Sequence, residues 1–200
     1  MEVVFGSSTL RLWVAAVIIL GAGLALAWRR THNFAYVLCC LVFGIYVLFA
    51  LNEALFPIRI DTSYVAAPEQ FLWSMNVIPF RFNFSELANI VVLQIFQNIL
   101  LTMPFGFGIS FIVPIKQRQV FMIAPVIGLG IEAVQLSISL LLRYPYRIID
   151  INDALLNALG VVVGYGLFRA FAWLLLKSVK HIGTKPSGLP GYIYEVAARR

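Results

Sequence analysis

The stretch RIIDINDALLNALG, residues 147 to 160, decides how this chain must fold. It places an arginine, aspartates and asparagine at the start of an apolar run. The whole chain has 200 residues, is 61% hydrophobic and 12% charged, and has a mean hydropathy of +0.90. A soluble domain usually contains about 25% charged residues. We therefore expect a membrane protein, in which the polar residues of this stretch need an explanation.

Five apolar stretches are long enough to span a bilayer, which takes about 20 residues. Unpaired backbone groups cannot face lipid, so each stretch should be a helix. The sequence predicts an all-α integral membrane protein with five transmembrane helices in one bundle, residues 1–176, and a cytoplasmic tail, residues 177–200. The expected helices are Leu12 to Trp28, Phe34 to Phe56, Leu87 to Pro114, Val120 to Leu142 and Ile151 to Leu176.

The positive charges indicate an orientation. With the N-terminus outside and the C-terminus in the cytoplasm, the inner segments hold nine Lys and Arg residues and the outer segments five. Cytoplasmic loops of membrane proteins are enriched in these residues. This enrichment also accounts for the net charge of +6, so we expect no nucleic-acid partner.

The segment from Pro57 to Glu86 differs from the short inner connections. Prolines break helices and aromatic side chains favour the membrane interface. We expect an interfacial or re-entrant segment over the outer mouth of the bundle, with an ordinary surface loop as the alternative. Asn83 followed by Glu86 is typical of the start of the third helix. The prolines and aromatics are Pro57, Pro68, Pro79, Tyr64, Phe71, Trp73, Phe80 and Phe82.

Polar residues fall on one face of each of the last three expected helices, because their spacings are 3 or 4. Polar groups within a membrane are costly and rarely face lipid, so these faces should point into the bundle. Counting 1.5 Å per residue places Asn98 and Glu132 roughly 12 Å below the outer boundary, and Asn157 about 9 to 11 Å. We predict one outer-leaflet polar site made of Gln94, Asn98, Glu132, Gln135, Arg147, Asp150, Asp153 and Asn157.

Structural roles are the alternative for each of these residues. Asp150 could cap the fifth helix, with Asp153 stabilised by the helix dipole. Arg147 could anchor the chain at the interface, and Glu132 could be a buried carboxyl group that stays neutral. Asn98 and Gln135 could link helices by hydrogen bonds. Glu53, near the end of the second helix, is a further candidate for the site.

Four pieces of the sequence resemble the VanZ-like family of membrane proteins, in the family's order. The last piece is the most specific, because all of its spacings agree. The resemblance covers residues 76–165 and marks Pro79, Phe80, Pro104, Gly106, Gly160 and Gly164 as structural positions. The pieces are Asn76-Val77-Ile78-Pro79-Phe80; Asn98-Ile99-Leu100-Leu101 with Pro104-Phe105-Gly106-Phe107; Ile131-Glu132 with Gln135; and Arg147, Asp150, Asp153, Asn157, Gly160, Gly164 and Tyr165.

The resemblance implies a multi-pass protein of the bacterial cytoplasmic membrane. The founding member of the family is associated with low-level resistance to the glycopeptide teicoplanin, and the family has no secure catalytic assignment. We expect the site to bind the headgroup of a membrane lipid, a cell-wall precursor or a lipoglycopeptide, without catalysis. The oligomeric state stays open.

Two other functions compete with binding. A membrane-embedded enzyme for a lipid-linked substrate would use Glu132, Asp150 and Asp153 for acid and base chemistry. No cofactor is expected, although a divalent metal at Asp150 and Asp153 would suit that chemistry. A lipid transporter or flippase would use Pro104 and the glycines for movement, but the apolar inner half shows no path across the membrane.

Overall fold

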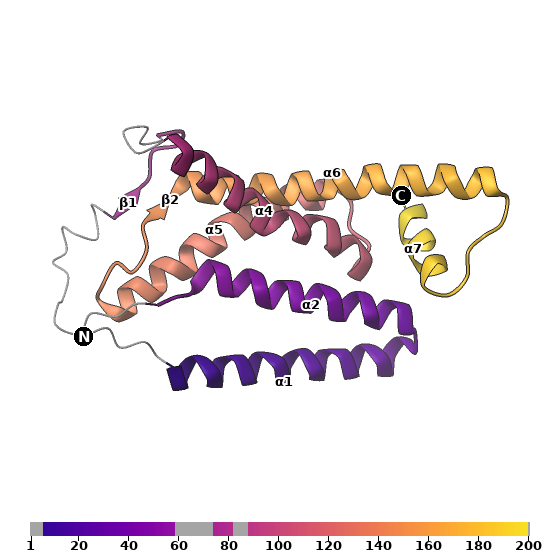
Figure 1. Cartoon of the computed structure of the whole chain (residues 1–200), viewed down its shortest axis with the longest axis horizontal. Helices are drawn as coiled ribbons and strands as arrows, with labels where there is room; N and C mark the ends of the chain where they lie inside the picture. The colour runs from indigo at the N-terminus through magenta and orange to yellow at the C-terminus, as the bar shows by residue number, and fades with distance from the viewer. Residues whose placement is uncertain (1–5, 59–73, 82–87, 200) are drawn as a thin grey trace.

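The computed structural model describes residues 6–58, 74–81 and 88–199. In these ranges the chain forms six helices and one pair of two-residue strands (Figure 1). Five of the helices are long and apolar enough to cross a membrane, and the sixth is short. The predicted all-α class with five transmembrane helices is thereby confirmed, whereas the predicted orientation of the termini stays a prediction.

A hairpin of α1 (Gly6–Thr31) and α2 (Phe34–Leu55) forms one edge of the bundle (Figure 1). Asn33 caps α2, because its side-chain oxygen accepts the N–H of Tyr36 at 3.1 Å. α1 packs chiefly against α2, and no residue is buried in its most apolar window. This helix therefore contributes little to the core of the bundle.

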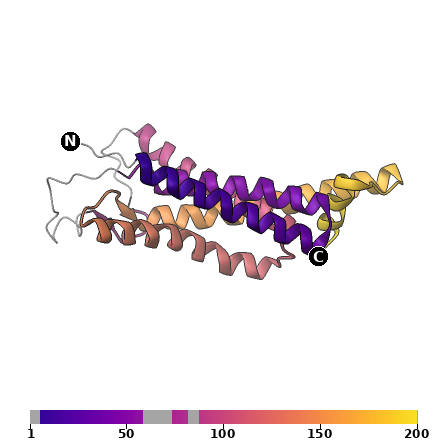
Figure 2. The ribbon, with the colours of Figure 1, turned by 90° about the horizontal axis from the view of Figure 1, so that it is seen from below.

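The central helix is α6 (Ile151–Ile182), with α4 (Ala88–Ile112) and α5 (Gln117–Leu142) packed along it. Viewed from below, α6 lies between the α1–α2 hairpin and α5 (Figure 2). Glycines set the helix spacing: a Cβ at Gly164 would overlap the carbonyl of Met103 on α4, and one at Gly128 would overlap the carbonyl of Ala154 on α6. Small residues let the backbones of membrane helices approach closely.

Two short strands mark one end of the bundle, which we call the strand end. β1 (Met75–Asn76) pairs in parallel with β2 (Ile149–Asp150), so that Met75 lies opposite Ile149. The last residues of α2 and α5 and the first residues of α4 and α6 lie at this end (Figure 1). The pairing ties the segment before α4 to the segment before α6.

The other end carries α7 (Gly188–Ala198), and we call it the α7 end. Tyr192 is buried there; its hydroxyl donates to the carbonyl of Phe111, and its ring meets that of Tyr36 edge-on. Phe107 and Phe111 pack with Phe168, with ring centroids 5.4 to 6.0 Å apart. Aromatic side chains therefore fill this half of the bundle.

The helix boundaries differ most from the expected ones in α1 and α6. α1 runs from Gly6 to Thr31 rather than from Leu12 to Trp28, and α6 continues to Ile182 rather than ending near Leu176. At 1.5 Å per residue α6 is about 48 Å long, more than the 30 Å hydrocarbon core requires. α4 remains helical on both sides of Pro104. The predicted interfacial segment is described only at Pro57, Ile58 and residues 74–81; its remainder, including Asn83 and Glu86, lies outside the described residues.

Candidate functional site

The start of α6 is built around Asp150, whose backbone is still extended while the next residue is helical. Its carboxylate accepts the N–H of Asn152 at 2.8 Å, which is the bond expected of an N-cap. The same oxygen accepts the side-chain N–H of Asn76 on β1 at 2.9 Å. Asp150 therefore has the capping role that was the structural alternative, and it joins two elements.

Asn152 holds the segment that contains the Pro79–Phe80 motif. It is 2% exposed; its side-chain oxygen accepts the N–H of Phe80 at 2.6 Å and its side-chain N–H donates to the carbonyl of Arg81 at 3.0 Å. Sequence reasoning missed this residue because it lies off the face that Asp150 and Asp153 were predicted to share. That off-face position, in the first turn of the helix, was the signal that Asn152 serves another part of the chain.

A polar ladder connects α4 with α6. Asp153 accepts one hydrogen bond from Asn98 at 2.7 Å, and Gln94 donates to its two oxygens at 3.1 and 3.3 Å. One turn deeper, the side chain of Asn157 donates to that of Asn98 at 3.5 Å, and Thr102 donates to the carbonyl of Asn157 at 2.6 Å. The predicted polar faces of these two helices thus meet.

α5 contributes two buried residues. Glu132 is 7% exposed, and its carboxylate accepts the backbone N–H of Asp150 at 3.1 Å. Gln135 is 6% exposed and donates to the carbonyl of Ala54 at 2.8 Å, at the end of α2. Glu132 therefore joins α5 to the start of α6, and Gln135 joins it to α2.

Arg147 also reaches the end of α2. Its guanidinium donates to the carbonyls of Glu53 at 3.1 Å and Phe56 at 2.8 Å. A positive charge beside the last carbonyls of a helix is favourable, because those carbonyls have no partner within the helix. Next to it, burial raises the pKa of Tyr146, although the charge of Arg147 acts in the opposite direction.

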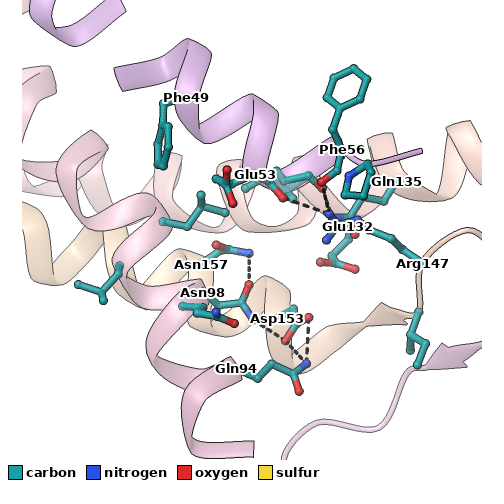
Figure 3. Close-up of a pocket in the computed structure, with 17 residues that line it drawn as sticks. Phe49, Glu53, Phe56, Gln94, Asn98, Glu132, Gln135, Arg147, Asp153 and Asn157 are labelled. Atoms are coloured by element: carbon teal, nitrogen blue, oxygen red, sulfur yellow. Dashed lines mark hydrogen bonds between the residues drawn. The ribbon is translucent and has the colours of Figure 1, made fainter. Parts of the chain in front are cut away.

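These residues surround one cavity of about 720 Å³ at the strand end, which we call the polar pocket (Figure 3). Seven of the eight predicted site residues line it, and Asp150 does not. Sequence reasoning left Glu53 open and missed Gln97, and both line the pocket. The polar lining is Glu53, Gln94, Gln97, Asn98, Glu132, Gln135, Arg147, Asp153 and Asn157; the apolar lining includes Phe49, Phe56, Leu100, Leu101 and Ile131.

The counts along the helices predicted that the polar residues lie at one depth. In the structure they lie at different levels along α6. Glu132 contacts the backbone of residue 150, whereas Asn157 lies seven residues further along α6. That difference corresponds to about 10 Å along the helix axis. The counts failed because they took each helix to end at the same boundary. The pocket is therefore elongated along α6.

The predicted metal at Asp150 and Asp153 stays a prediction. The two carboxylates have different hydrogen-bond partners. Asp150 accepts from Asn76 and Asn152. Asp153 accepts from Gln94 and Asn98. Within the described parts of the chain, no group of three or more His, Cys, Asp and Glu side chains is placed to hold a metal ion.

Comparison with known proteins gives one match. A family model described as VanZ/LLP1 matches residues 43–175, which include α4, α5, most of α6 and all the residues that line the polar pocket. No curated protein and no solved structure matches the chain.

Proposed function

The chain belongs to the VanZ/LLP1 family, and we propose that it acts in the bacterial cytoplasmic membrane by binding an amine-bearing headgroup in the polar pocket. The headgroup would belong to a lipid or to a lipid-linked envelope molecule. A cell-wall precursor and a lipidated glycopeptide such as teicoplanin have the same combination of amine, hydroxyl groups and hydrocarbon. Resistance to teicoplanin would follow if the pocket sequestered the drug or altered access to its target.

The observation that carries the proposal is the charge of the pocket. Three carboxyl groups, those of Glu53, Glu132 and Asp153, line it with a single guanidinium. Arg147 makes its hydrogen bonds to backbone carbonyls at the end of α2 rather than to these carboxyl groups. Of the three, Glu132 is buried, Asp153 is half-buried and Glu53 is exposed. A carboxylate removed from water is costly unless a positive charge or hydrogen-bond donors accompany it. A ligand amine would supply both.

Asn157 supports the same ligand chemistry. It is 1% exposed, lines the pocket, and its side-chain oxygen has no hydrogen-bond partner among the described residues. Exchanging the amide oxygen and nitrogen of Asn157 would set its oxygen against the side-chain oxygen of Asn98, so the bond to Asn98 would be lost as well. Such a group is costly when it is buried, and a ligand N–H that reached it would satisfy it.

The proposal is tested by binding of phosphatidylethanolamine to the purified protein in nanodiscs. Asp153→Asn keeps the size of the side chain but removes its charge, so affinity should fall about tenfold or more, as expected for a hydrogen bond to a charged group. The matched control is Glu195→Gln on α7, an exposed carboxyl group remote from the pocket. Unchanged affinity in a correctly folded Asp153→Asn protein would overturn the proposal.

An enzyme is the second candidate, favoured by one observation. Glu132 and Asp153 line the same cavity from different helices, and pairs of carboxyl groups often share acid and base roles. Glu132→Gln should then abolish turnover of a lipid substrate in reconstituted vesicles. An unchanged lipid composition after incubation with wild-type protein, measured by mass spectrometry, would remove this candidate. The aromatic filling of the α7 end argues against a transport path.

A further inference from the structure

The polar pocket has a flank between α2 and α4. Deeper in the bundle these two helices are in close contact: the hydroxyl of Tyr46 donates to the carbonyl of Leu101 at 2.6 Å, and the rings of Phe43 and Phe105 lie 5.5 Å apart. From there toward the strand end the two helices diverge (Figure 1). The pocket begins where this contact ends, since Leu101 is part of its lining.

The rim of this flank is open to the surroundings of the protein. Phe49 on α2 is 60% exposed and Leu100 on α4 is 53% exposed, and both line the pocket together with the exposed Gln97. The two helices are apolar enough to span a membrane in these regions. Leu100 lies twelve residues after Ala88, about 18 Å along α4, and therefore at hydrocarbon depth if α4 begins near the interface.

Apolar side chains make up part of this rim, beside the exposed Gln97 and Glu53. Asp153 and Asn98 bond to one another inside the pocket, whereas Phe49 and Leu100 form its edge. Figure 3 shows the ring of Phe49 beside α2, apart from Gln94, Asn98 and Asp153. This is the order of polarity in a lipid molecule, with a polar headgroup attached to a hydrocarbon chain.

We infer that the ligand enters the pocket sideways from the bilayer, between α2 and α4, and that it is a lipid. Its acyl chain stays against Phe49 and Leu100 while the headgroup reaches Asp153. This inference rests on the proposed function and adds the route and the ligand class. Two polar contacts hold the end of α2 across the strand end, from Gln135 to Ala54 and from Arg147 to Phe56. Neither contact crosses the α2–α4 flank.

The test narrows the flank by a substitution at its rim. Leu100→Trp places an indole ring where the smaller leucine side chain forms the rim. Leu129→Trp is the matched control, because Leu129 on α5 is also 53% exposed but does not line the pocket. Two ligands are compared: phosphatidylethanolamine with a fluorescent acyl chain, and water-soluble glycerophosphoethanolamine. Leu100→Trp should weaken binding of the lipid about tenfold, the cost of overpacking a contact, and change binding of the soluble headgroup less than about twofold. Leu129→Trp should change neither.

Other outcomes separate this inference from the proposed function. Unchanged lipid binding in Leu100→Trp, or an equal loss of affinity for both ligands, would overturn the lateral route. Leu100→Phe is a smaller change and should give an intermediate loss of affinity for the lipid. It keeps the test valid if the tryptophan variant misfolds. Equal affinity of wild-type protein for the lipid and the soluble headgroup would also overturn the route, because the chain would then contribute nothing. Insensitivity of both ligands to Asp153→Asn would instead overturn the proposed function.

Discussion

Single side chains at the start of α6 divide structural and binding roles between them. Asp150 and Asn152 face the segment around β1, whereas Asp153 and Asn157 line the pocket. Spacing alone predicted which of these residues share a helix face, and that part was correct for Asp153 and Asn157. It could not predict that Asp150 turns to Asn76, because the partner lies 74 residues away in the chain.

Asn157 offers a prediction at this scale. Replacing it with Leu, which has the same branched shape, removes a buried oxygen that lacks a partner. The lost oxygen had no partner, and the lost N–H made only the 3.5 Å bond to Asn98, so the thermal midpoint should fall little. Affinity for phosphatidylethanolamine should fall. A much lower midpoint together with unchanged affinity would show that Asn157 has only a structural role.

At the scale of elements, hydropathy was enough to find the helices but not their contacts. Each spanning helix is a run of apolar residues whose existence follows from composition, and α6 exceeded its expected end because lysines can extend a helix beyond the membrane. The flank between α2 and α4 could not be predicted, since it depends on where two helices diverge. The two short strands lacked any periodic signal because they are two residues long.

Gly164 tests the packing of α4 on α6. A Cβ at this position would overlap the carbonyl of Met103, which belongs to the backbone and cannot rotate away. Gly164→Ala should therefore lower the free energy of unfolding by about 1–3 kcal/mol, as overpacking does. Gly166→Ala on the same helix is the control, because nothing lies within 4 Å of its added Cβ. Similar thermal midpoints for the two variants would contradict the close contact.

Tyr192 tests the docking of α7. Tyr192→Phe removes the hydrogen bond to Phe111, at a cost of about 1 kcal/mol. Burial raises the pKa of Tyr192 to about 12, so between about pH 10 and 12 the unfolded chain releases a proton that the folded protein keeps. Stability should decline as pH rises through this window, and not below it. Thermal unfolding should show a smaller decline for Tyr192→Phe; equal declines would mean that Tyr192 titrates freely.

At the scale of the whole molecule, the positive charges predict the side of the membrane on which the pocket lies. Arg143→Cys at the strand end and Lys185→Cys near the α7 end replace exposed basic residues at opposite ends of the bundle. With Cys39 and Cys40 changed to Ser, a membrane-impermeant maleimide should label position 143 in intact cells and position 185 only after permeabilisation. The reverse pattern would place the polar pocket on the cytoplasmic side.

The peripheral position of α1 has an evolutionary consequence. A helix that packs chiefly against one neighbour and otherwise meets lipid is selected for hydrophobicity rather than for shape. Its glycines at positions 21 and 23 have open space around them, so larger residues would fit there. Relatives should therefore preserve the apolar composition of this helix while its individual residues vary. The match to the family model begins at residue 43, after the end of α1.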